Sequence, residues 1–272
     1  MKCFYHSADL DGICSGAIVK MQKPDCEMIG INYGDSLPWT AIKAGETVYM
    51  VDFSLPMDEM ERLNGICSLI WIDHHKSAIE DAKARSFLAS GHQSLVIGSA
   101  ACELTWKEFC QGDVCRAVAL LGQYDVWDYQ DHPEVLEFQY GMRQFNATPT
   151  DIGFWETIFF GDIQSIIEQG RSFLTYEEVQ NDIYAKTFAF EVNFDGHTCI
   201  AINKGLTNSL LFRSVYDPAR HDAMIAFVRR SGYWKISIYT DKPEIDASAI
   251  CKAHGGGGHQ KASGFQCKIL PF

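Results

Sequence analysis

The side chains best suited to chemistry gather in two short stretches, each of which directly follows an apolar run. The first stretch offers His6, Asp9 and Asp11, and the second offers Asp73, His74 and His75. Polar groups at the end of a buried strand are costly unless they have partners or a function. Two strand ends that both supply carboxylate and imidazole predict a pocket for more than one divalent metal ion.

Two further aspartates extend this predicted metal site. Asp52 follows the apolar run 48–51, and Asp125 follows a predicted helix that ends at Gly122. Taken alone, each is an ordinary acidic residue, and Asp11 could equally cap the helix that follows it. Taken together, carboxylates and imidazoles without thiolate suit Mn²⁺, and suit Mg²⁺ or Fe²⁺ less well. Two such ions can activate water and hold the attacking and leaving oxygens of an in-line displacement at phosphorus.

A run of four glycines, Gly255–Gly258, precedes His259 near the end of the chain. Glycines let backbone N–H groups converge on an anion, and the imidazole could donate to a phosphate or stack on a base. A glycine run by itself is equally typical of a mobile loop. Its meaning therefore depends on the histidines and aspartates upstream.

The elements that must position these residues alternate between strand and helix in the first half of the chain. Apolar runs predict strands over 2–6, 28–32, 47–51 and 68–72, and helical spacing predicts helices over 11–21, 56–63, 99–109 and 114–122. Continuous apolar strands separated by helices are typical of a parallel sheet covered on both faces. Ligands bind at the carboxyl ends of such strands. His6, Asp52 and Asp73 all fall at these ends.

The pattern changes in the second half of the chain. Residues 162–186 have the spacing of a more polar helix that connects two domains. Strands are predicted over 188–194, 198–203, 223–229 and 234–239, with a turn at Asp195-Gly196, and a helix over 245–253. We therefore expect an α/β protein with a domain over 1–160, a connecting helix over 161–187 and a smaller α/β domain over 188–272.

Composition limits the partners and the location. The 272 residues are 47% hydrophobic, and the net charge of −12 argues against a basic surface that grips long nucleic acid. No apolar run approaches the length of a membrane span, and the first residues lack a signal-peptide core. The ten cysteines include no Cys-x-x-Cys pair, which favours free thiols over a zinc ribbon. We expect a cytoplasmic protein.

The two metal-binding stretches and the glycine run together resemble a known superfamily. The order His-x-x-Asp-x-Asp-Gly, an aspartate after a strand, Asp-His-His and a later aspartate looks like the DHH phosphoesterases. The run from Gly255 through Phe265 is similar to the signature of the DHHA1 domain that follows in most of them. The superfamily includes RecJ-type exonucleases, nanoRNases, phosphatases of phosphoadenosine phosphate, cyclic-dinucleotide phosphodiesterases and family II pyrophosphatases. The resemblance covers the whole chain.

The resemblance implies roles for individual residues. One metal would be held by His6, Asp9 and Asp52, and the second by Asp11, Asp52, His74 and Asp125, with Asp52 bridging. His75 would stabilise charge on the scissile phosphate, and Asp73 would orient a ligand histidine. The substrate-binding residues would be Gly256, Gly257, Gly258, His259, Tyr239 and Arg229.

One departure from the pattern bears on the substrate. Many DHHA1 domains of the nanoRNase type carry a Ser-x-Arg-Ser stretch, where this chain has 237–240, and Tyr239 takes the place of the arginine. Tyrosine cannot make a bidentate phosphate contact but can stack on a base. Arg213, Arg229, Arg230 and Lys261 are candidates for the missing charge.

The resemblance implies hydrolysis of phosphodiester bonds in very short oligonucleotides, giving mononucleotides. Phosphoadenosine phosphate and cyclic dinucleotides are alternative substrates, and a pyrophosphatase or polyphosphatase is a further alternative. Outside the enzymes, a module that senses a nucleotide or a metal without turnover stays open. We expect no long double-stranded nucleic acid and no membrane as partner, and the sequence leaves a homodimer open.

Overall fold

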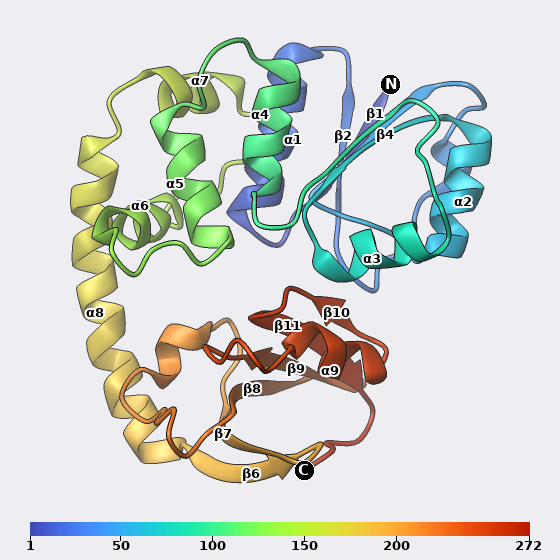
Figure 1. Ribbon diagram of the computed structural model, residues 1–272. Helices are drawn as coiled ribbons and strands as arrows, with labels where there is room; N and C mark the ends of the chain where they lie inside the picture. Colours follow the sequence, from blue (N-terminus) through green and yellow to red (C-terminus); the bar gives the residue numbers. More distant parts are fainter. The chain divides into compact units, whose positions relative to one another are not determined.

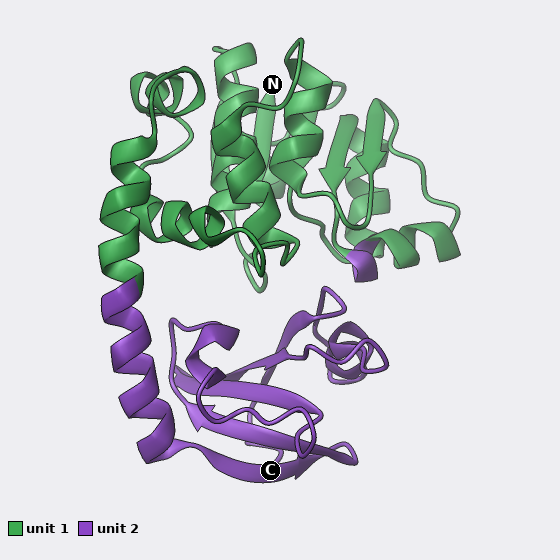
Figure 2. Ribbon diagram, turned by 60° about the vertical axis from the view of Figure 1, so that its left-hand side comes forward, with its two compact units in different colours: residues 1–75, 79–174 green, residues 76–78, 175–272 purple.

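The computed structural model describes residues 1–272, which divide into two compact units (Figure 2). The first unit comprises 1–75 and 79–174, and the second comprises 76–78 and 175–272. A single long helix, α8 (Gln164–Phe188), carries the chain from one unit to the other (Figure 1). Each unit is built around a sheet of its own.

The first unit holds a sheet of five parallel strands in the order β2-β1-β3-β4-β5. The strands are β1 (Lys2–His6), β2 (Glu27–Ile31), β3 (Thr47–Val51), β4 (Ser68–Asp73) and β5 (His92–Leu95). The three central strands are almost wholly buried, as expected for strands covered on both faces. The predicted parallel sheet is confirmed, so the carboxyl ends of its strands meet at one edge.

Helices cover both faces of this sheet. Figure 1 shows α1 and α4 on one face and α2 and α3 on the other. The helices of this unit are α1 (Leu10–Gln22), α2 (Met57–Ile66), α3 (Lys76–Ala84), α4 (Ala101–Phe109), α5 (Arg116–Asp125), α6 (Pro133–Met142) and α7 (Ile152–Phe160), with a 3₁₀ turn at Trp39–Ala41. Side chains of α1, α4, α5, α6 and α7 form one apolar core, which includes the buried Trp155 and Phe138. This shared core holds α1 and α4 against each other and against the other helices of the layer.

Helix α5 differs from its prediction in a way that matters for the site. The sequence predicts an end at Gly122, but the helix continues to Asp125. Gly122 lies inside the helix and allows a close approach to α4, because a Cβ on it would lie 2.9 Å from Cγ of Glu103. Asp125 is therefore held in the last turn of a helix rather than in a loop.

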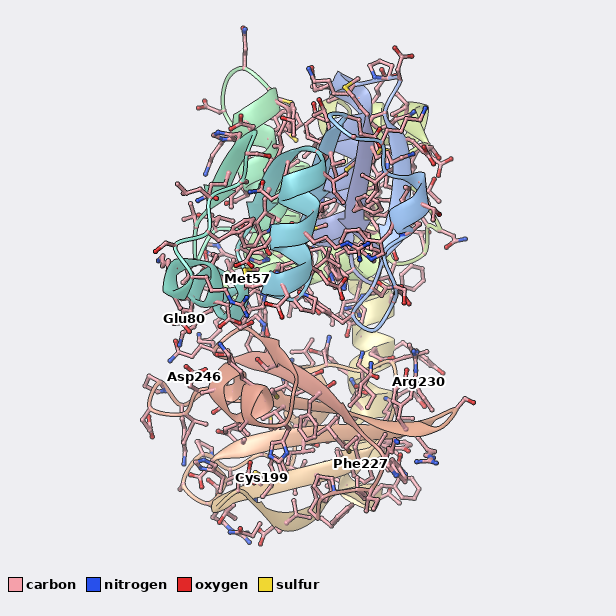
Figure 3. The ribbon with its side chains drawn as sticks, turned by 90° about the vertical axis from the view of Figure 1, so that its right-hand side faces the viewer. Met57, Glu80, Cys199, Phe227, Arg230 and Asp246 are labelled. Atoms are coloured by element: carbon pink, nitrogen blue, oxygen red, sulfur yellow. The ribbon has the colours of Figure 1, made fainter.

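The second unit holds a mixed sheet of six strands in the order β10-β11-β9-β8-β7-β6. Strands β7 and β8 are parallel, and the other neighbours are antiparallel. Its elements are β6 (Phe190–Phe194), β7 (His197–Asn203), a 3₁₀ turn (Ser209–Phe212), β8 (Ala223–Arg230), β9 (Tyr233–Tyr239), α9 (Ala247–Ala253), β10 (Gly257–Gly258) and β11 (Ala262–Cys267). Cys199 on β7, and Phe227 and Arg230 on β8, mark the sheet in Figure 3.

The two faces of the second sheet are covered by different elements. On one face Ile225 and Phe265 pack with Cys251 of α9. On the other face Ile200 and Ile202 pack with the 3₁₀ turn and with the end of α8. A sheet with a helix on one face and a second layer on the other is an α/β unit, as predicted for this part of the chain.

Two general features complete the description. None of the ten cysteines forms a disulfide, and seven of them are buried. No helix combines the length and the apolar character that crossing a membrane requires.

Candidate metal centre

Three of the predicted site residues of the first unit come from neighbouring strand ends. His6 is the last residue of β1, Asp52 comes directly after β3, and Asp73 is the last residue of β4. Strand β3 pairs with β1 on one side and with β4 on the other. The sheet therefore places these side chains in a row at its carboxyl edge.

Asp52 occupies the centre of this row and has an unusual backbone. Its φ of 53° lies in the left-handed region, which aspartate tolerates better than most residues. Its N–H still donates to the carbonyl of Ile72 at 2.9 Å, so the residue stays tied to β4. Asp52 Oδ2 lies 3.6 Å from His6 Nδ1, and Asp52 Oδ1 lies 3.2 Å from His74 Nε2. One carboxylate thus faces two different histidines.

The first set of ligands consists of His6, Asp9 and Asp52. His6 Nδ1 lies 2.9 Å from Asp9 Oδ2. The other oxygen of Asp9 accepts the backbone N–H of Gly12 at 3.0 Å, which caps helix α1. The alternative that Asp11 caps this helix is therefore wrong, because Asp9 does so.

The second set surrounds His74. Its Nε2 lies 3.3 Å from Asp11 Oδ2, 3.2 Å from Asp52 Oδ1 and 3.2 Å from Asp125 Oδ2. Asp11 accepts the backbone N–H groups of Ala101 at 2.9 Å and of Cys102 at 2.7 Å, at the start of α4. The start of α4, 90 residues further along the chain, thus holds the Asp11 side chain of α1 in place.

The electrostatics of this cluster fit divalent cations. Burial, together with the charges of Asp52 and Asp125, raises the pKa of Asp11 well above its usual range. Burial opposes the charged form of His6, but the neighbouring Asp9 and Asp52 outweigh it and raise the pKa of His6 to about 11. His6 Nδ1 and Asp52 Oδ1 are buried without a well-formed hydrogen bond. Clustered carboxylates with such atoms are the donor set that a cation would complete.

Asp73 and His75 form a separate pair beside the two sets. Asp73 Oδ1 accepts the backbone N–H groups of His74 at 2.7 Å and His75 at 3.1 Å, and it lies 2.7 Å from His75 Nδ1. Burial opposes the charge of Asp73, but His75 outweighs it, and the pKa of Asp73 falls to about 2. An ionised carboxylate only accepts, so His75 Nδ1 carries a proton. Burial opposes the charge of His75, but Asp73 outweighs it and raises the pKa of His75, which favours the imidazolium with a second proton on Nε2.

Tyr33 also belongs to this edge, although it was not among the predicted site residues. It follows the end of β2, which pairs with β1. Its ring centroid lies 5.5 Å from that of His6 and 6.1 Å from that of His75. The rule that ligands collect at carboxyl strand ends, applied to the strand predicted at 28–32, would have found it.

The predicted substrate-binding glycines lie in the second unit, and two of the three form a short strand. Gly257 and Gly258 form β10, which pairs with Gly264 and Ser263 of β11. Beyond it the chain makes a tight turn, in which the N–H of His259 donates to the carbonyl of Ala262 at 2.8 Å. Gly257 and Gly258 are thus paired in a strand, whereas Gly255 and Gly256 lie in the segment before it.

The register separates the other two predicted substrate-binding residues. Tyr239 pairs with Ala262, next to the row that contains Gly258, and its hydroxyl donates to the carbonyl of Thr207 at 3.3 Å. Arg229 pairs with Trp234, over whose ring its guanidinium lies at 5.5 Å. Arg229 is next to Arg230, which Figure 3 labels at the end of β8. The structure brings Tyr239 close to the glycine strand and places Arg229 towards the other end of the sheet.

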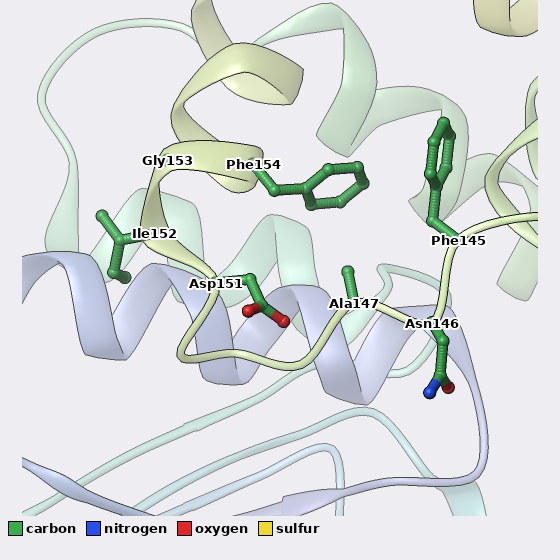
Figure 4. Close-up of a pocket in the computed structure, with 7 residues that line it drawn as sticks. All are labelled: Phe145, Asn146, Ala147, Asp151, Ile152, Gly153 and Phe154. Carbon is green, nitrogen blue, oxygen red and sulfur yellow. The ribbon is translucent and has the colours of Figure 1, made fainter.

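A hollow of about 500 Å³ lies elsewhere in the first unit (Figure 4). Its lining includes Phe145, Asp151 and Phe154. The Asp151 carboxylate accepts from the backbone N–H of Thr148 at 2.6 Å and from its hydroxyl at 2.9 Å. This carboxylate therefore stabilises its own turn, and none of the predicted site residues lines the hollow.

Comparisons with known proteins agree on the fold. No protein-family model matches the chain, and no curated protein matches it. Three solved structures resemble almost all of it, each with a probability of 1.00. The first is the pGpG-specific phosphodiesterase PggH from Vibrio cholerae, with a TM-score of 0.54 and 11% identity over 98% of this chain and 93% of that one. The second is an exopolyphosphatase-related protein from Bacteroides fragilis, with a TM-score of 0.56 and 14% identity over 99% of this chain and 87% of that one. The third is a DHH domain described as a member of the s1p family of ribosomal proteins, with a TM-score of 0.56 and 13% identity over 98% of this chain and 82% of that one.

At these identities the likeness concerns the fold. The chain has the α/β fold of these three proteins, with a parallel-sheet unit, a helical connection and a second unit built on a mixed sheet. The fold class predicted from the sequence is confirmed.

Proposed function

We propose that this protein is a metal-dependent phosphoesterase that hydrolyses phosphodiester bonds in very short oligonucleotides. The observation that carries the proposal is the position of Asp52, whose two oxygens face two separate sets of histidine and aspartate ligands. A carboxylate that bridges two cations is the central element of a two-metal site for in-line displacement at phosphorus.

Each set of ligands would hold one cation. His6, Asp9 and Asp52 would form one site, and Asp11, Asp52, His74 and Asp125 the other, with Asp52 shared. Bound there, divalent ions would supply Lewis acidity to the phosphoryl group and lower the pKa of water. The ligand set contains no thiolate, which favours Mn²⁺ over softer metals and leaves Mg²⁺ and Fe²⁺ as alternatives.

His75 would act on the phosphate itself. Its Nδ1 donates to Asp73 Oδ1 at 2.7 Å, which fixes the orientation of the ring. As an imidazolium, which its raised pKa favours, His75 could donate from Nε2 to a non-bridging oxygen of the substrate and stabilise the negative charge that builds there. Asp73 would act through His75 as a positioning residue.

The second unit would bind the rest of a small nucleotide. The ring of His259 would supply a donor for an anion, and the neighbouring glycines carry no carboxylate that would repel it. The backbone N–H of Gly256 already donates to the carbonyl of Cys251 at 2.9 Å, so the glycines would shape the site rather than donate to the anion as a set. One protein with this fold is a pGpG-specific phosphodiesterase, which is consistent with a small nucleotide substrate here. The net charge of −12 disfavours a long polyanion.

Product analysis in the presence of Mn²⁺ tests this proposal. The substrates would be 5′-phosphorylated di-, tri- and pentaribonucleotides, phosphoadenosine phosphate, cyclic dinucleotides and pyrophosphate. The variant would be Asp73→Ala/His74→Ala, and its matched control would be Asp131→Ala/His132→Ala, an adjacent aspartate and histidine that are both exposed. Mononucleotides released by the wild type and the control, but not by the site variant, would support the proposal.

The other outcomes separate the alternatives. Turnover of phosphoadenosine phosphate or cyclic dinucleotides alone would change the substrate but keep the metal chemistry. Turnover of pyrophosphate alone would contradict the proposed role of the second unit. No turnover of any substrate, with metal bound, would favour a module that senses nucleotides.

A further inference from the structure

Tyr33 is the exposed member of a cluster of four rings at the carboxyl edge of the first sheet. The residue is 50% exposed, whereas His6, Phe53 and His75 are exposed by 9%, 2% and 8%. All three of these rings lie close to Tyr33, with centroids 4.8 to 6.1 Å away. The proposed metal and phosphate ligands are therefore buried, whereas Tyr33 beside them is half exposed.

The neighbours of Tyr33 support its ring without enclosing it. Phe53 packs against it at a centroid distance of 4.8 Å and a tilt of 38°. His6 and His75 meet it at steep angles of 66° and 73°. An aromatic ring held by a buried phenylalanine loses little freedom when a ligand stacks on it, so such a ring is preorganised for stacking.

The place of Tyr33 suits one part of a nucleotide in particular. His75 is the residue proposed to contact the scissile phosphate, and His6 is a proposed ligand of one metal. A nucleobase is joined to its phosphate through a ribose, so a surface that binds the base must lie beside the phosphate-binding residues. Tyr33 lies beside both histidines.

We infer that Tyr33 is the surface on which a nucleobase next to the scissile phosphate stacks. The inference rests on the proposed phosphodiesterase activity and narrows its substrates to nucleotides, since pyrophosphate has no ring to stack. Stacking on an aromatic side chain tolerates any base, so Tyr33 would contribute affinity without choosing among the four.

The test compares two variants on substrates with and without the base. Tyr33→Phe keeps the ring, and Tyr33→Ala removes it. The matched control is Tyr176→Ala on α8, which removes another exposed tyrosine, 67% exposed, in the second unit. The substrates are a 5′-phosphorylated diribonucleotide and two analogues, each lacking the base at one of its two positions. For each pair we would measure kcat, KM and the bound Mn²⁺.

The inference expects a specific pattern. Tyr33→Ala raises the KM for the intact dinucleotide by about 5- to 100-fold, the usual range for one stacked base. It has little effect on the analogue that lacks the stacked base, and Tyr33→Phe and Tyr176→Ala resemble the wild type. Bound Mn²⁺ stays the same in all of them.

Three results would overturn the inference, and a fourth would refute the proposed function on which it rests. A Tyr33→Phe variant as impaired as Tyr33→Ala would show that the hydroxyl is the working group. Equal losses on intact and base-free substrates, or a loss of Mn²⁺, would show that the ring only positions His6 or His75. A wild type that cleaves none of the dinucleotides would refute the proposed function itself, whatever the variants do.

Discussion

The carboxyl edge of the first sheet and the glycine strand of the second are built on opposite principles. At the first, Asp11, Asp52 and His74 are all at most 3% exposed and crowd together. At the second, Gly257 and Gly258 are half-buried and offer only backbone groups, with His259 as the nearby imidazole. The first region concentrates charge, and the second avoids it.

The difference shows which of the two regions destabilises the folded protein. Buried carboxylates of like charge destabilise a protein unless cations or hydrogen bonds offset them, and the raised pKa of Asp11 is a sign of that cost. A short glycine strand paired with its neighbour carries only an entropic cost. We therefore expect changes in the first region to abolish chemistry and changes in the second to alter substrate binding.

The largest effect is expected from Asp52→Asn. Asparagine tolerates the left-handed backbone at this position, so the change removes the bridging charge without straining the chain. Activity with Mn²⁺ should fall by about three orders of magnitude or more, because metal ions supply several kcal/mol of transition-state stabilisation. Metal analysis of the purified variant should find less than two Mn²⁺ per chain.

Asp151→Asn is the control for this variant, since Asp151 lies in the same unit and stabilises only its own turn. It should keep both metal ions and full activity. If Asp52→Asn binds two Mn²⁺ as tightly as the wild type, the bridging role of Asp52 is wrong. The contrast between a metal-binding edge in the first unit and a substrate-binding strand in the second would then also be wrong.

His75→Ala should have the next largest effect and should act differently. His75 is proposed to contact the phosphate rather than a metal, so Mn²⁺ content should not change. The kcat should fall by about 100- to 1,000-fold with a smaller change in KM, as when one preorganised donor to a transition state is lost. Steady-state kinetics beside metal analysis checks this, and His132→Ala, at an exposed histidine, is the control. Loss of metal together with activity would move His75 into the ligand set.

Asp73→Asn should reduce kcat by about 10- to 100-fold, the usual effect of losing a group that orients a catalytic histidine. It should also change stability in a pH-dependent way. The pKa of Asp73 is about 2 in the folded protein against an ordinary 3.8, so its charge stabilises the fold above pH 3.8. This contribution, about 2 kcal/mol, is lost as the pH falls towards 2.

Urea denaturation with a chelator present, repeated from pH 7 down to pH 3, measures this stability difference. Asparagine does not titrate, so the gap in unfolding free energy between wild type and Asp73→Asn should narrow below pH 4. A gap that stays constant over this range would mean that the Asp73 charge does not stabilise the fold.

Continuous apolar runs made the central strands predictable. Strands β1 and β3 begin and end where the sequence predicts, because each contains a continuous apolar run, as is typical of buried parallel strands. Strand β5 was missed, since its residues His92–Leu95 are mostly polar and it is held only by pairing with β4. Edge strands of this kind carry little sequence signal.

Long-range contacts made the rest of the site unpredictable. The carboxylate of Asp11 is fixed by backbone N–H groups of Ala101 and Cys102, and no local pattern announces a bond across 90 residues. The left-handed backbone of Asp52 likewise depends on its pairing with β4. The residue types could be read from the sequence, but the arrangement of the two oxygens of Asp52 required the sheet.

The smallest effect is expected from Gly256→Ala, in the second region. A Cβ on Gly256 would collide with the carbonyl oxygen of Gly264, so β10 must shift away from β11. The KM for short oligonucleotides should rise by about tenfold, equivalent to roughly one lost hydrogen bond, while Mn²⁺ content stays the same. Gly65→Ala is the control, because a Cβ there meets nothing within 4 Å. A fall in kcat or metal content in Gly256→Ala would show that the glycine strand takes part in the chemistry, and the division between a reactive edge and a binding strand would not hold.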